Sequence, residues 1–360
     1  MPLPTHSNRF ILSHPPTDLP VLSGPSPTFS LQTSPLPSLS PDQVVLKTIF
    51  ISNDPAQRAW ITAGLDPARL YTPPVLPGQV MRSRNVATVL DSTSEKYQPG
   101  DLVMMSMGWI DHLVTDAGNV DRKIEKVPGL SETHFLGALG LTGLTALYGI
   151  RDIARATGGE TVVVSGAAGA TGSMVVQIAK HVIGVKRVIG IAGDEKKCRW
   201  VEGLGADVCL NYKEEGFREK MVEATPEYVE VYFDNVGGHI LDFMLTRMKR
   251  FGRVAACGAI TQYNKGEKDG LKNWFEVISN RIEIKGFVIL DFIGAGKGPA
   301  AVGELVQAYK DGKIKLGDEN ETVVDTKFAD VPKTWMMLFE GKNTGKLVTK
   351  ITDGAVQGSL

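Results

Sequence analysis

The chain has 360 residues, of which 42% are hydrophobic and 22% are charged, and its formal net charge is -1 at pH 7. These values are typical of a globular protein with room for about two domains, and they exclude the basic footprint of a nucleic-acid-binding protein. The longest apolar runs are well short of the about 18 residues that a membrane-spanning helix needs. The start of the chain, MPLPTHSNRF, lacks the basic segment followed by an apolar segment of a secretory signal. Cys198, Cys209 and Cys257 are too scattered for a disulfide framework or a structural zinc site, so we expect a cytoplasmic protein with no membrane partner.

The first part of the chain, residues 1–135, is predicted to form short strands separated by turns. The expected strands lie at 9–13, 29–32, 44–52, 86–91 and 102–107. Prolines are frequent up to Pro41, which would also suit a disordered arm. Apolar positions recur between the prolines, and this recurrence favours β-structure.

The pattern changes near Leu136. A small, apolar stretch at 139–150 predicts a buried helix, and strands then alternate with helices. The expected strands are 161–165, 187–192, 207–210, 229–234, 252–257 and 282–290, and the expected helices are 172–183, 195–204, 214–224 and 238–249. Such alternation predicts an α/β fold with a doubly wound parallel sheet.

The end of the chain returns to β-character. An amphipathic helix is expected at 299–312, followed by strand-like segments at 322–325 and 346–351. This order predicts a nucleotide-binding domain at 136–295, inserted between two parts of a β-rich substrate domain at 1–135 and 296–360. Contiguous tandem domains are the alternative.

A glycine-rich turn lies between the strand at 161–165 and the next helix. The run VVVSGAAGATGSMVVQIAK, at 162–180, carries Gly166, Gly169 and Gly172 at spacings of three. A strand, a glycine turn and a helix in this order predict a dinucleotide site, in which the helix N-terminus receives the phosphates.

The type of nucleotide depends on the end of the second strand. Ala192 and Gly193 stand where an NAD-selective fold places an acid for the ribose 2′-hydroxyl, and Lys196 and Lys197 follow closely. The lysines could hold a 2′-phosphate. Two alternatives stay open: Asp194 could be the missing acid, or it could simply cap the helix with both lysines solvated.

A set of motifs then occurs in one order along nearly the whole chain. These are SNDPAQR at 52–58, GLTGLTALYG at 140–149, GAAGATGS at 166–173, AGDEKKCRWVEGLGAD at 192–207, NYK at 211–213, YFDNVGG at 232–238, CGAITQYN at 257–264, GFVILDF at 286–292 and GKNTGK at 341–346. In this set of motifs the chain resembles the zinc-independent medium-chain dehydrogenase/reductase superfamily. Within that superfamily it most resembles the leukotriene B4 12-hydroxydehydrogenase group, which includes prostaglandin, alkenal and curcumin reductases. The resemblance implies a Rossmann-type sheet inserted into a GroES-like β-rich domain, with NADPH/NADP+ as the cofactor.

The resemblance also implies cofactor contacts. Lys197 and Tyr212 fall on the family's contacts to the 2′-phosphate, and Asn343 falls on a position near the nicotinamide or phosphate. Tyr212 could instead only cap the connection between a helix and a strand, and Asn235 could belong to a simple Asn-Val-Gly-Gly turn. The full set of expected cofactor residues is Thr142, Gly166, Ala168, Gly169, Ala170, Thr171, Gly172, Gly193, Lys197, Tyr212, Asn235, Gly258, Ala259, Tyr263, Asn343 and Gly345.

The segments where zinc relatives carry their ligands contain none here. SNDPAQR at 52–58 and PGQVMRSRN at 77–85 lack cysteine and histidine, and neither His112 nor His134 has a cysteine near it in sequence. We therefore expect no metal and no zinc-dependent alcohol oxidation. In the family, hydride from NADPH goes to the β-carbon of an α,β-unsaturated ketone or aldehyde instead.

One catalytic residue and four substrate-pocket residues follow from the resemblance. Tyr263 holds the position of the family tyrosine that stabilises the developing enolate, and it could also donate the proton to the α-carbon. A phenol with a pKa near 10 is a good hydrogen-bond donor. A pocket-wall role without chemistry is the alternative. The expected pocket residues are Ala56, Ser83, Trp109 and Phe292. Ala56 replaces a family aromatic, and Ser83 and Asn85 replace glycines, so we hypothesise a roomier or more polar pocket and a bulkier enone.

The leading function is therefore NADPH-dependent reduction of an enone C=C bond. A quinone reductase of the zeta-crystallin type, an allylic alcohol dehydrogenase and a non-enzymatic NADPH-binding protein are the alternatives. The family implies a homodimer in which the strand near 286–290 pairs across subunits, although a buried central strand would have the same apolar pattern.

Overall fold

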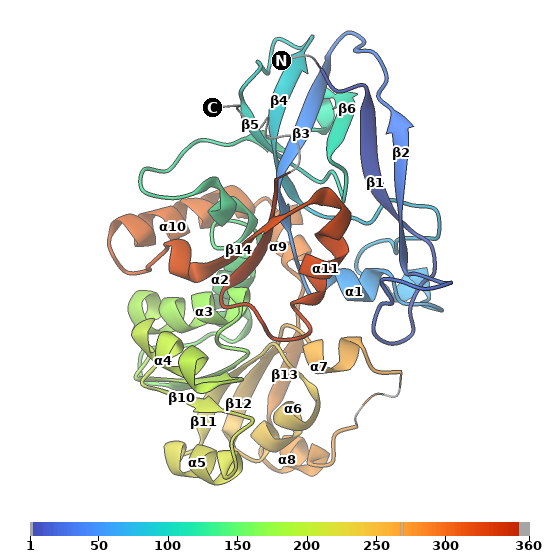
Figure 1. Cartoon of the computed structure of the whole chain (residues 1–360). Helices are drawn as coiled ribbons and strands as arrows, with labels where there is room; N and C mark the ends of the chain where they lie inside the picture. The colour runs from blue at the N-terminus through green and yellow to red at the C-terminus, as the bar shows by residue number, and fades with distance from the viewer. Residues whose placement is uncertain (1–2, 267, 269, 353–360) are drawn as a thin grey trace. The chain divides into compact units, whose positions relative to one another are not determined.

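The structure, a computed structural model, describes residues 3–266, 268 and 270–352, and its chain divides into two compact units (Figure 1). Unit 1 contains the chain up to Leu136, residues 322–342 and the residues from Leu347 on. Unit 2 holds Gly137–Glu321 and Asn343–Lys346. Residues 296–321 thus belong to unit 2 and not to the returning β-rich part that we expected from 296, because the helix at Gly298–Lys310 packs against the helix at Leu141–Tyr148.

Unit 1 is built from antiparallel strands. β1 and β2 form a two-stranded sheet, and a larger sheet has the order β14-β15-β3-β4-β5-β7, with β6 paired to β3. Its elements are β1 (His6–Leu12), β2 (Phe29–Pro35), β3 (Gln43–Ser52), α1 (Gln57–Trp60), β4 (Asn85–Ser92), β5 (Leu102–Met105), β6 (His112–Asp116), β7 (Arg122–Lys123), β14 (Glu321–Thr326), α11 (Val331–Met336) and β15 (Lys346–Ile351). The proline-rich start is therefore ordered into strands rather than a disordered arm.

Two hydrophobic clusters stabilise unit 1. One gathers aromatic side chains, in which the Trp109 ring lies 4.8 Å from Phe29 and 5.7 Å from Trp335, measured between centroids. The other lies in the larger sheet and includes Val44, Leu46 and Val89. Because alternate residues of a strand point to opposite faces, a strand such as β3 can contribute side chains to both clusters.

Unit 2 contains a six-stranded parallel sheet in the order β10-β9-β8-β11-β12-β13. Its strands are β8 (Thr161–Ser165), β9 (Arg187–Ala192), β10 (Val208–Asn211), β11 (Val229–Asp234), β12 (Met248–Ala256) and β13 (Glu283–Gly286). The predicted fold class, a doubly wound parallel sheet together with a β-rich part, is confirmed. The strand order reverses between β8 and β11, and ligands bind at the carboxyl edge of such a reversal.

Helices connect the strands of unit 2, and Figure 1 shows α4, α5, α6 and α8 flanking them. The helices are α2 (Leu141–Tyr148), α3 (Ala170–Gln177), α4 (Glu195–Gly203), α5 (Phe217–Ala224), α6 (Gly238–Leu245), α7 (Ile260–Tyr263), α8 (Trp274–Ser279), α9 (Ile289–Gly294) and α10 (Gly298–Lys310). Wider π-helical turns at Gly149–Ile153 and Ile178–Ile183 extend α2 and α3. The strand expected at 282–290 is too long, because β13 ends at Gly286 and α9 begins at Ile289.

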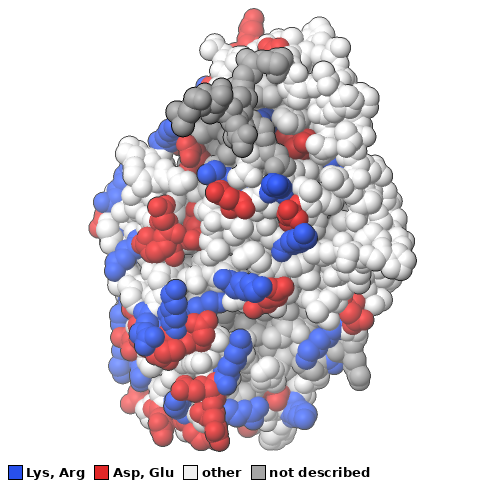
Figure 2. All heavy atoms as spheres, viewed as in Figure 1, with Lys and Arg blue, Asp and Glu red and all other residues white. Residues whose placement is uncertain are grey.

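On the face drawn in Figure 2, basic and acidic side chains are interspersed and no large field of one sign is visible. Among the described residues, no helix combines the length and apolar character needed to cross a membrane.

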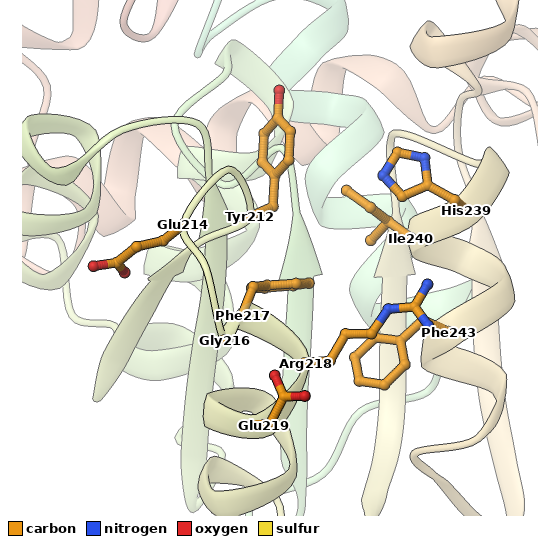
Figure 3. Close-up of a pocket in the computed structure, with 9 residues that line it drawn as sticks. All are labelled: Tyr212, Glu214, Gly216, Phe217, Arg218, Glu219, His239, Ile240 and Phe243. Carbon is orange, nitrogen blue, oxygen red and sulfur yellow. The ribbon is translucent and has the colours of Figure 1, made fainter.

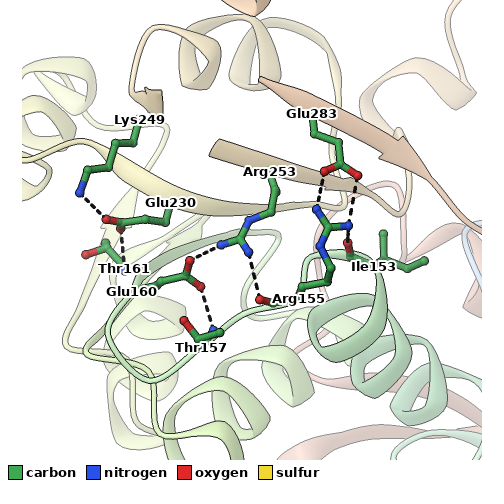
Figure 4. A network of polar contacts seen from close by, with 9 residues as sticks. All are labelled: Ile153, Arg155, Thr157, Glu160, Thr161, Glu230, Lys249, Arg253 and Glu283. Carbon is green, nitrogen blue, oxygen red and sulfur yellow. Dashed lines mark hydrogen bonds and ion pairs between the residues drawn. The ribbon is translucent and has the colours of Figure 1, made fainter. Parts of the chain in front are cut away.

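A network of charged side chains joins the amino ends of the parallel strands (Figure 4). Glu230 in β11 accepts hydrogen bonds from Lys249 Nζ at 2.6 Å and from the Thr161 N–H of β8 at 2.9 Å. Arg253 in β12 pairs with Glu160. These contacts connect three neighbouring strands at the edge opposite to the carboxyl ends.

Glu230 gives the first prediction. Burial acts to raise the pKa of Glu230, but Lys249 and the Thr161 N–H outweigh it and hold the pKa below its ordinary value of 4.5. A lowered pKa in the folded state means that the ionised carboxylate stabilises the fold above the unfolded pKa and that this stability is lost as the pH falls through the folded pKa. We expect Glu230→Gln to lower the free energy of unfolding by about 1 kcal/mol near neutral pH, with the deficit shrinking below about pH 4.

Urea unfolding across this pH range measures the effect. Glu227→Gln is the matched control, because Glu227 and its partner Lys186 are 82% and 67% exposed and solvent screens such a pair. An equal loss for both variants, or a Glu230→Gln deficit that does not depend on pH, would contradict the assignment.

Candidate functional site

The glycine turn after β8 has a geometry that only glycine permits. A Cβ on Gly172 would lie 2.3 Å from the Gly166 carbonyl oxygen, and Gly166 itself has a φ of +57°. The first turn of α3 therefore packs directly against the turn. Because the first N–H groups of a helix have no partner within the helix, Ala170, Thr171 and Gly172 present donors where a phosphate can bind.

A distant segment of the chain lies beside this turn. The Gly345 N–H donates to the Ala168 carbonyl at 2.8 Å, and Asn343 Nδ2 donates to the Gly345 carbonyl at 2.9 Å. Gly345 has a φ of +63°, and a Cβ there would lie 1.8 Å from the Asn320 carbonyl oxygen, so the position requires glycine. The structure thus brings Asn343 and Gly345 to the glycine turn, and their contact to a nucleotide stays a prediction.

The end of β9 carries a cluster of basic side chains. Asp194 caps α4 by accepting the Lys197 N–H at 2.8 Å, so its carboxylate is engaged in capping. The Tyr212 ring lies over Gly193, where an added Cβ would be 3.2 Å from Tyr212 Cε1, and Lys213 Nζ lies 5.7 Å from the ring centroid.

The half-buried Lys197 is suited to an anion. Burial lowers the pKa of Lys197, Asp194 acts to raise it, and Lys213 lowers it further. Burial and a second cation both disfavour the charged ammonium, and a bound phosphate would compensate for both. Lys197, Gly193 and Tyr212 therefore come together as a site that fits a ribose 2′-phosphate.

A pocket of about 270 Å³ adjoins Tyr212, between the start of α5 and the start of α6 (Figure 3). Phe217 and Phe243 line it with ring centroids 6.1 Å apart, and the Arg218 guanidinium lies 5.1 Å from the Phe243 centroid. Tyr212 and His239 line it as well. The lining is mixed, because Glu214 and Glu219 also border the pocket, and its aromatic rings offer faces on which a flat heteroaromatic ring can stack. Sequence reasoning missed this pocket, because phenylalanines and an arginine on two helices have no motif spacing.

Tyr263, the catalytic residue expected from the sequence, lies in the segment that follows β12. Tyr263 ends α7, and its hydroxyl oxygen accepts the Ala259 N–H at 3.3 Å. The Tyr263 hydroxyl lies close to Gly258, where an added Cβ would be 3.4 Å from it and 3.2 Å from the Asn235 carbonyl oxygen. A hydroxyl that accepts a hydrogen bond becomes a stronger donor in turn. Tyr263, Gly258 and Ala259 therefore form one group at the carboxyl edge.

Thr142, an expected cofactor contact, and Phe292, an expected pocket residue, lie in different surroundings in unit 2. The buried Thr142 Oγ1, in the first turn of α2, has no hydrogen-bond partner among the described residues. Such an orphaned polar atom fits a contact to a polar ligand. Phe292 is only 3% exposed and packs on Tyr148 with a centroid distance of 4.7 Å, so its observed role is packing.

The expected pocket residues of unit 1 are mostly internal. Trp109 is fully buried in the aromatic cluster, and Ser83 Oγ donates to Asn85 Oδ1 at 2.9 Å. Asn85 Nδ2 donates to the Gly108 carbonyl at 3.0 Å. Ser83 and Asn85 thus satisfy each other and hold the Gly108 loop rather than lining a polar cavity. Ala56 is half-buried at the N-cap of α1, and its effect on substrate size stays a prediction.

Comparisons with known proteins identify the class. Residues 9–123 match the family model described as the N-terminal domain of oxidoreductase, and residues 170–306 match the one described as zinc-binding dehydrogenase. No group of three or more His, Cys, Asp or Glu side chains that could hold a metal occurs among the described residues. The absence of a metal cofactor stays a prediction from the sequence.

Relatives match over nearly the whole chain. Prostaglandin reductase 1 of Sus scrofa is 34% identical over 330 residues, covering 91% of this chain and 95% of the relative. The NADP-dependent oxidoreductase RED1 of Cochliobolus heterostrophus is 38% identical over 320 residues, covering 86% of this chain and 88% of the relative. The crystal structure of CurA in complex with NADPH from Vibrio vulnificus matches with a TM-score of 0.82 at 30% identity, over 96% of this chain and 99% of that one.

The chain therefore belongs to the medium-chain dehydrogenase/reductase superfamily, in its prostaglandin reductase and alkenal reductase group. The family recognised from the ordered motifs is confirmed, and the protein is an oxidoreductase.

Proposed function

We propose that this chain reduces the C=C bond of an α,β-unsaturated ketone or aldehyde with NADPH as the hydride donor. The relatives named prostaglandin reductase and NADP-dependent oxidoreductase, and the NADPH complex of CurA, support this activity over quinone reduction, allylic alcohol oxidation or simple nucleotide binding. The observation that carries it is the row of sites along the carboxyl edge of unit 2, with a phosphate-binding turn between a basic cluster and a tyrosine.

NADPH fits the residues of that edge. The N–H groups at the start of α3 bind the pyrophosphate, Lys197 and Tyr212 bind the 2′-phosphate, and the pocket beside Tyr212 accepts the adenine ring. Thr142, Asn235 and Asn343 belong to the same set of contacts. When bound, the cofactor supplies a hydride equivalent from its nicotinamide ring.

Lys197 gives a direct test of the cofactor site. We expect Lys197→Ala to weaken NADPH binding by about ten- to hundredfold, because a charge-assisted hydrogen bond to a phosphate is lost, and to leave NADH binding nearly unchanged. Fluorescence titration with each nucleotide measures this. Lys196→Ala is the matched control, since Lys196 is the exposed neighbour on the same helix. Equal effects of the two variants on NADPH would overturn the assignment.

Tyr263 is the proposed donor to the developing enolate oxygen. A donor aimed at charge that forms only in the transition state lowers the barrier without strengthening ground-state binding. The hydrogen bond from the Ala259 N–H polarises the phenol in the required sense.

Tyr263→Phe should therefore lower kcat by about 100-fold while the Kd for NADPH stays within about twofold. Stopped-flow rates of hydride transfer, with Kd from fluorescence titration, separate the two quantities. A variant with normal kcat would reduce Tyr263 to a pocket-wall residue.

A homodimer is proposed through the edge of the parallel sheet. β13 is the last strand in the order of the six-stranded sheet, and α8, which precedes it, exposes Trp274, Phe275 and Ile278 at 51%, 73% and 61%. Exposed apolar side chains in a group are typical of an interaction surface. The pairing segment is β13 itself, since residues 289–294 are helical.

Sedimentation at micromolar concentration tests the dimer. We expect Phe275→Asp combined with Ile278→Asp to shift the chain to a monomer, because two charges would be buried in the interface. Val222→Asp, at a 44% exposed apolar position on α5, should leave a dimer. A wild-type chain that sediments as a monomer would contradict the proposal.

Cytoplasmic residence is also proposed. Its support is that Cys198, Cys209 and Cys257 are all free thiols, as is usual in a reducing compartment.

A further inference from the structure

β11 ends in a buried carboxylate that the expected cofactor contacts do not include. Asp234 is 1% exposed, and its Oδ1 accepts hydrogen bonds from the Tyr232 hydroxyl at 2.8 Å and the Ser165 hydroxyl at 3.0 Å. The N–H groups of Val236 and Gly237 donate to the same carboxylate at 3.1 Å. Burial raises the pKa of Asp234, while these donors favour its ionised form.

The main chain of Asp234 holds a second loop. Its carbonyl oxygen accepts the N–H groups of Cys257 at 2.9 Å and Gly258 at 3.1 Å. Gly258 leads directly into Ala259, whose N–H donates to the Tyr263 hydroxyl. The position of the tyrosine is therefore two hydrogen bonds away from Asp234.

The side chain of Asp234 also reaches the glycine turn through Ser165, the last residue of β8. Ser165 Oγ donates to Asp234 and accepts the Asn235 N–H at 2.9 Å. Asn235 Nδ2 donates to the Ser165 carbonyl at 2.7 Å, at the peptide bond that begins the turn with Gly166. One residue thus connects three loops that come from β8, β11 and β12.

We propose that Asp234 is a positioning residue, which holds the glycine turn at 166–172 and the Tyr263 segment at one fixed spacing and so sets the geometry of hydride transfer. It acts through Ser165, Gly237 and Gly258 and touches neither cofactor nor substrate. The inference rests on the proposed cofactor site. The alternative is a cap that stabilises only the start of α6.

Asp234→Asn distinguishes these two roles. The amide nitrogen of asparagine would take the place of Oδ2 and face the Gly237 N–H, and its neutral carbonyl oxygen would bind the donors at Oδ1 more weakly than a carboxylate does. The three loops would therefore be held less tightly. We expect the Kd for NADPH to rise about tenfold, kcat to fall by at least as much, and the primary isotope effect on kcat to increase. Ser165→Ala removes the connection to the glycine turn, and it should show the same changes to a smaller extent.

Asp207→Asn is the matched control. Asp207 also accepts a backbone N–H, that of Val188 at 2.7 Å, but it lies at the amino end of the sheet. We expect this variant to lose thermal stability while its Kd and kcat stay within about twofold of the wild type. Asp234→Asn or Ser165→Ala variants that lose only stability, as Asp207→Asn does, would overturn the proposal.

Hydrogen exchange of the cofactor-free chain gives a readout that does not depend on activity. The amides of Cys257, Gly258 and Ala259 should exchange about tenfold faster in Asp234→Asn and unchanged in Asp207→Asn. Unchanged exchange together with an unchanged Kd would contradict the role of Asp234. A wild-type chain that binds no NADPH would instead contradict the proposed function, so the two failures can be told apart.

Discussion

The close approach of α3 to the end of β8 is the constraint on which the site depends. With no side chain at Gly172, the first helical turn reaches the Gly166 carbonyl, and the helix begins within five residues of the strand end. This places the N-terminus of α3 at the carboxyl edge of a parallel sheet, where its free N–H groups and dipole favour an anion. A larger residue at Gly172 would move the helix away from the edge and remove the phosphate site with it.

Parallel strand order then distributes chemistry along this edge. β9 and β10 lie on one side of β8 and supply Lys197 and Tyr212, whereas β11 and β12 lie on the other side and supply Asn235 and Tyr263. An extended dinucleotide has a phosphate-rich end and a reactive end, and the glycine turn lies between the two groups of residues. Hydrogen bonds centred on Asp234 connect the turn to the reactive side, so the spacing that hydride transfer needs is fixed before any ligand binds.

The amino-acid sequence was informative where a local pattern determines structure. β8, β9 and β11 have the predicted bounds, because short runs of β-branched residues end in clear turn signals. The apolar run at 287–290 predicts a strand, which is wrong, because periodicity does not separate a short buried strand from the start of a helix. The boundary at 296 was placed too early, since the packing of α10 on α2 is a tertiary contact with no local signal.

The site shows the same division. Motif residues such as Gly172, Tyr212 and Tyr263 are distributed along the carboxyl edge of the sheet in unit 2. Trp109 and Phe292 are instead buried among other aromatic rings, and burial cannot be read from residue identity alone. Asp234 was missed because an aspartate at a strand end usually starts a turn. Its position directly after the apolar run of β11, ahead of Asn-Val-Gly-Gly, was the available signal.

The fate of the transferred hydride tests the central claim most directly. Wild-type enzyme would be incubated with benzylideneacetone and NADPH that is deuterated at the transferring position of the nicotinamide ring, and the product would be analysed by NMR. The account predicts the saturated ketone with deuterium on the β-carbon. Deuterium on a carbinol carbon, with the double bond intact, would show carbonyl reduction and contradict it.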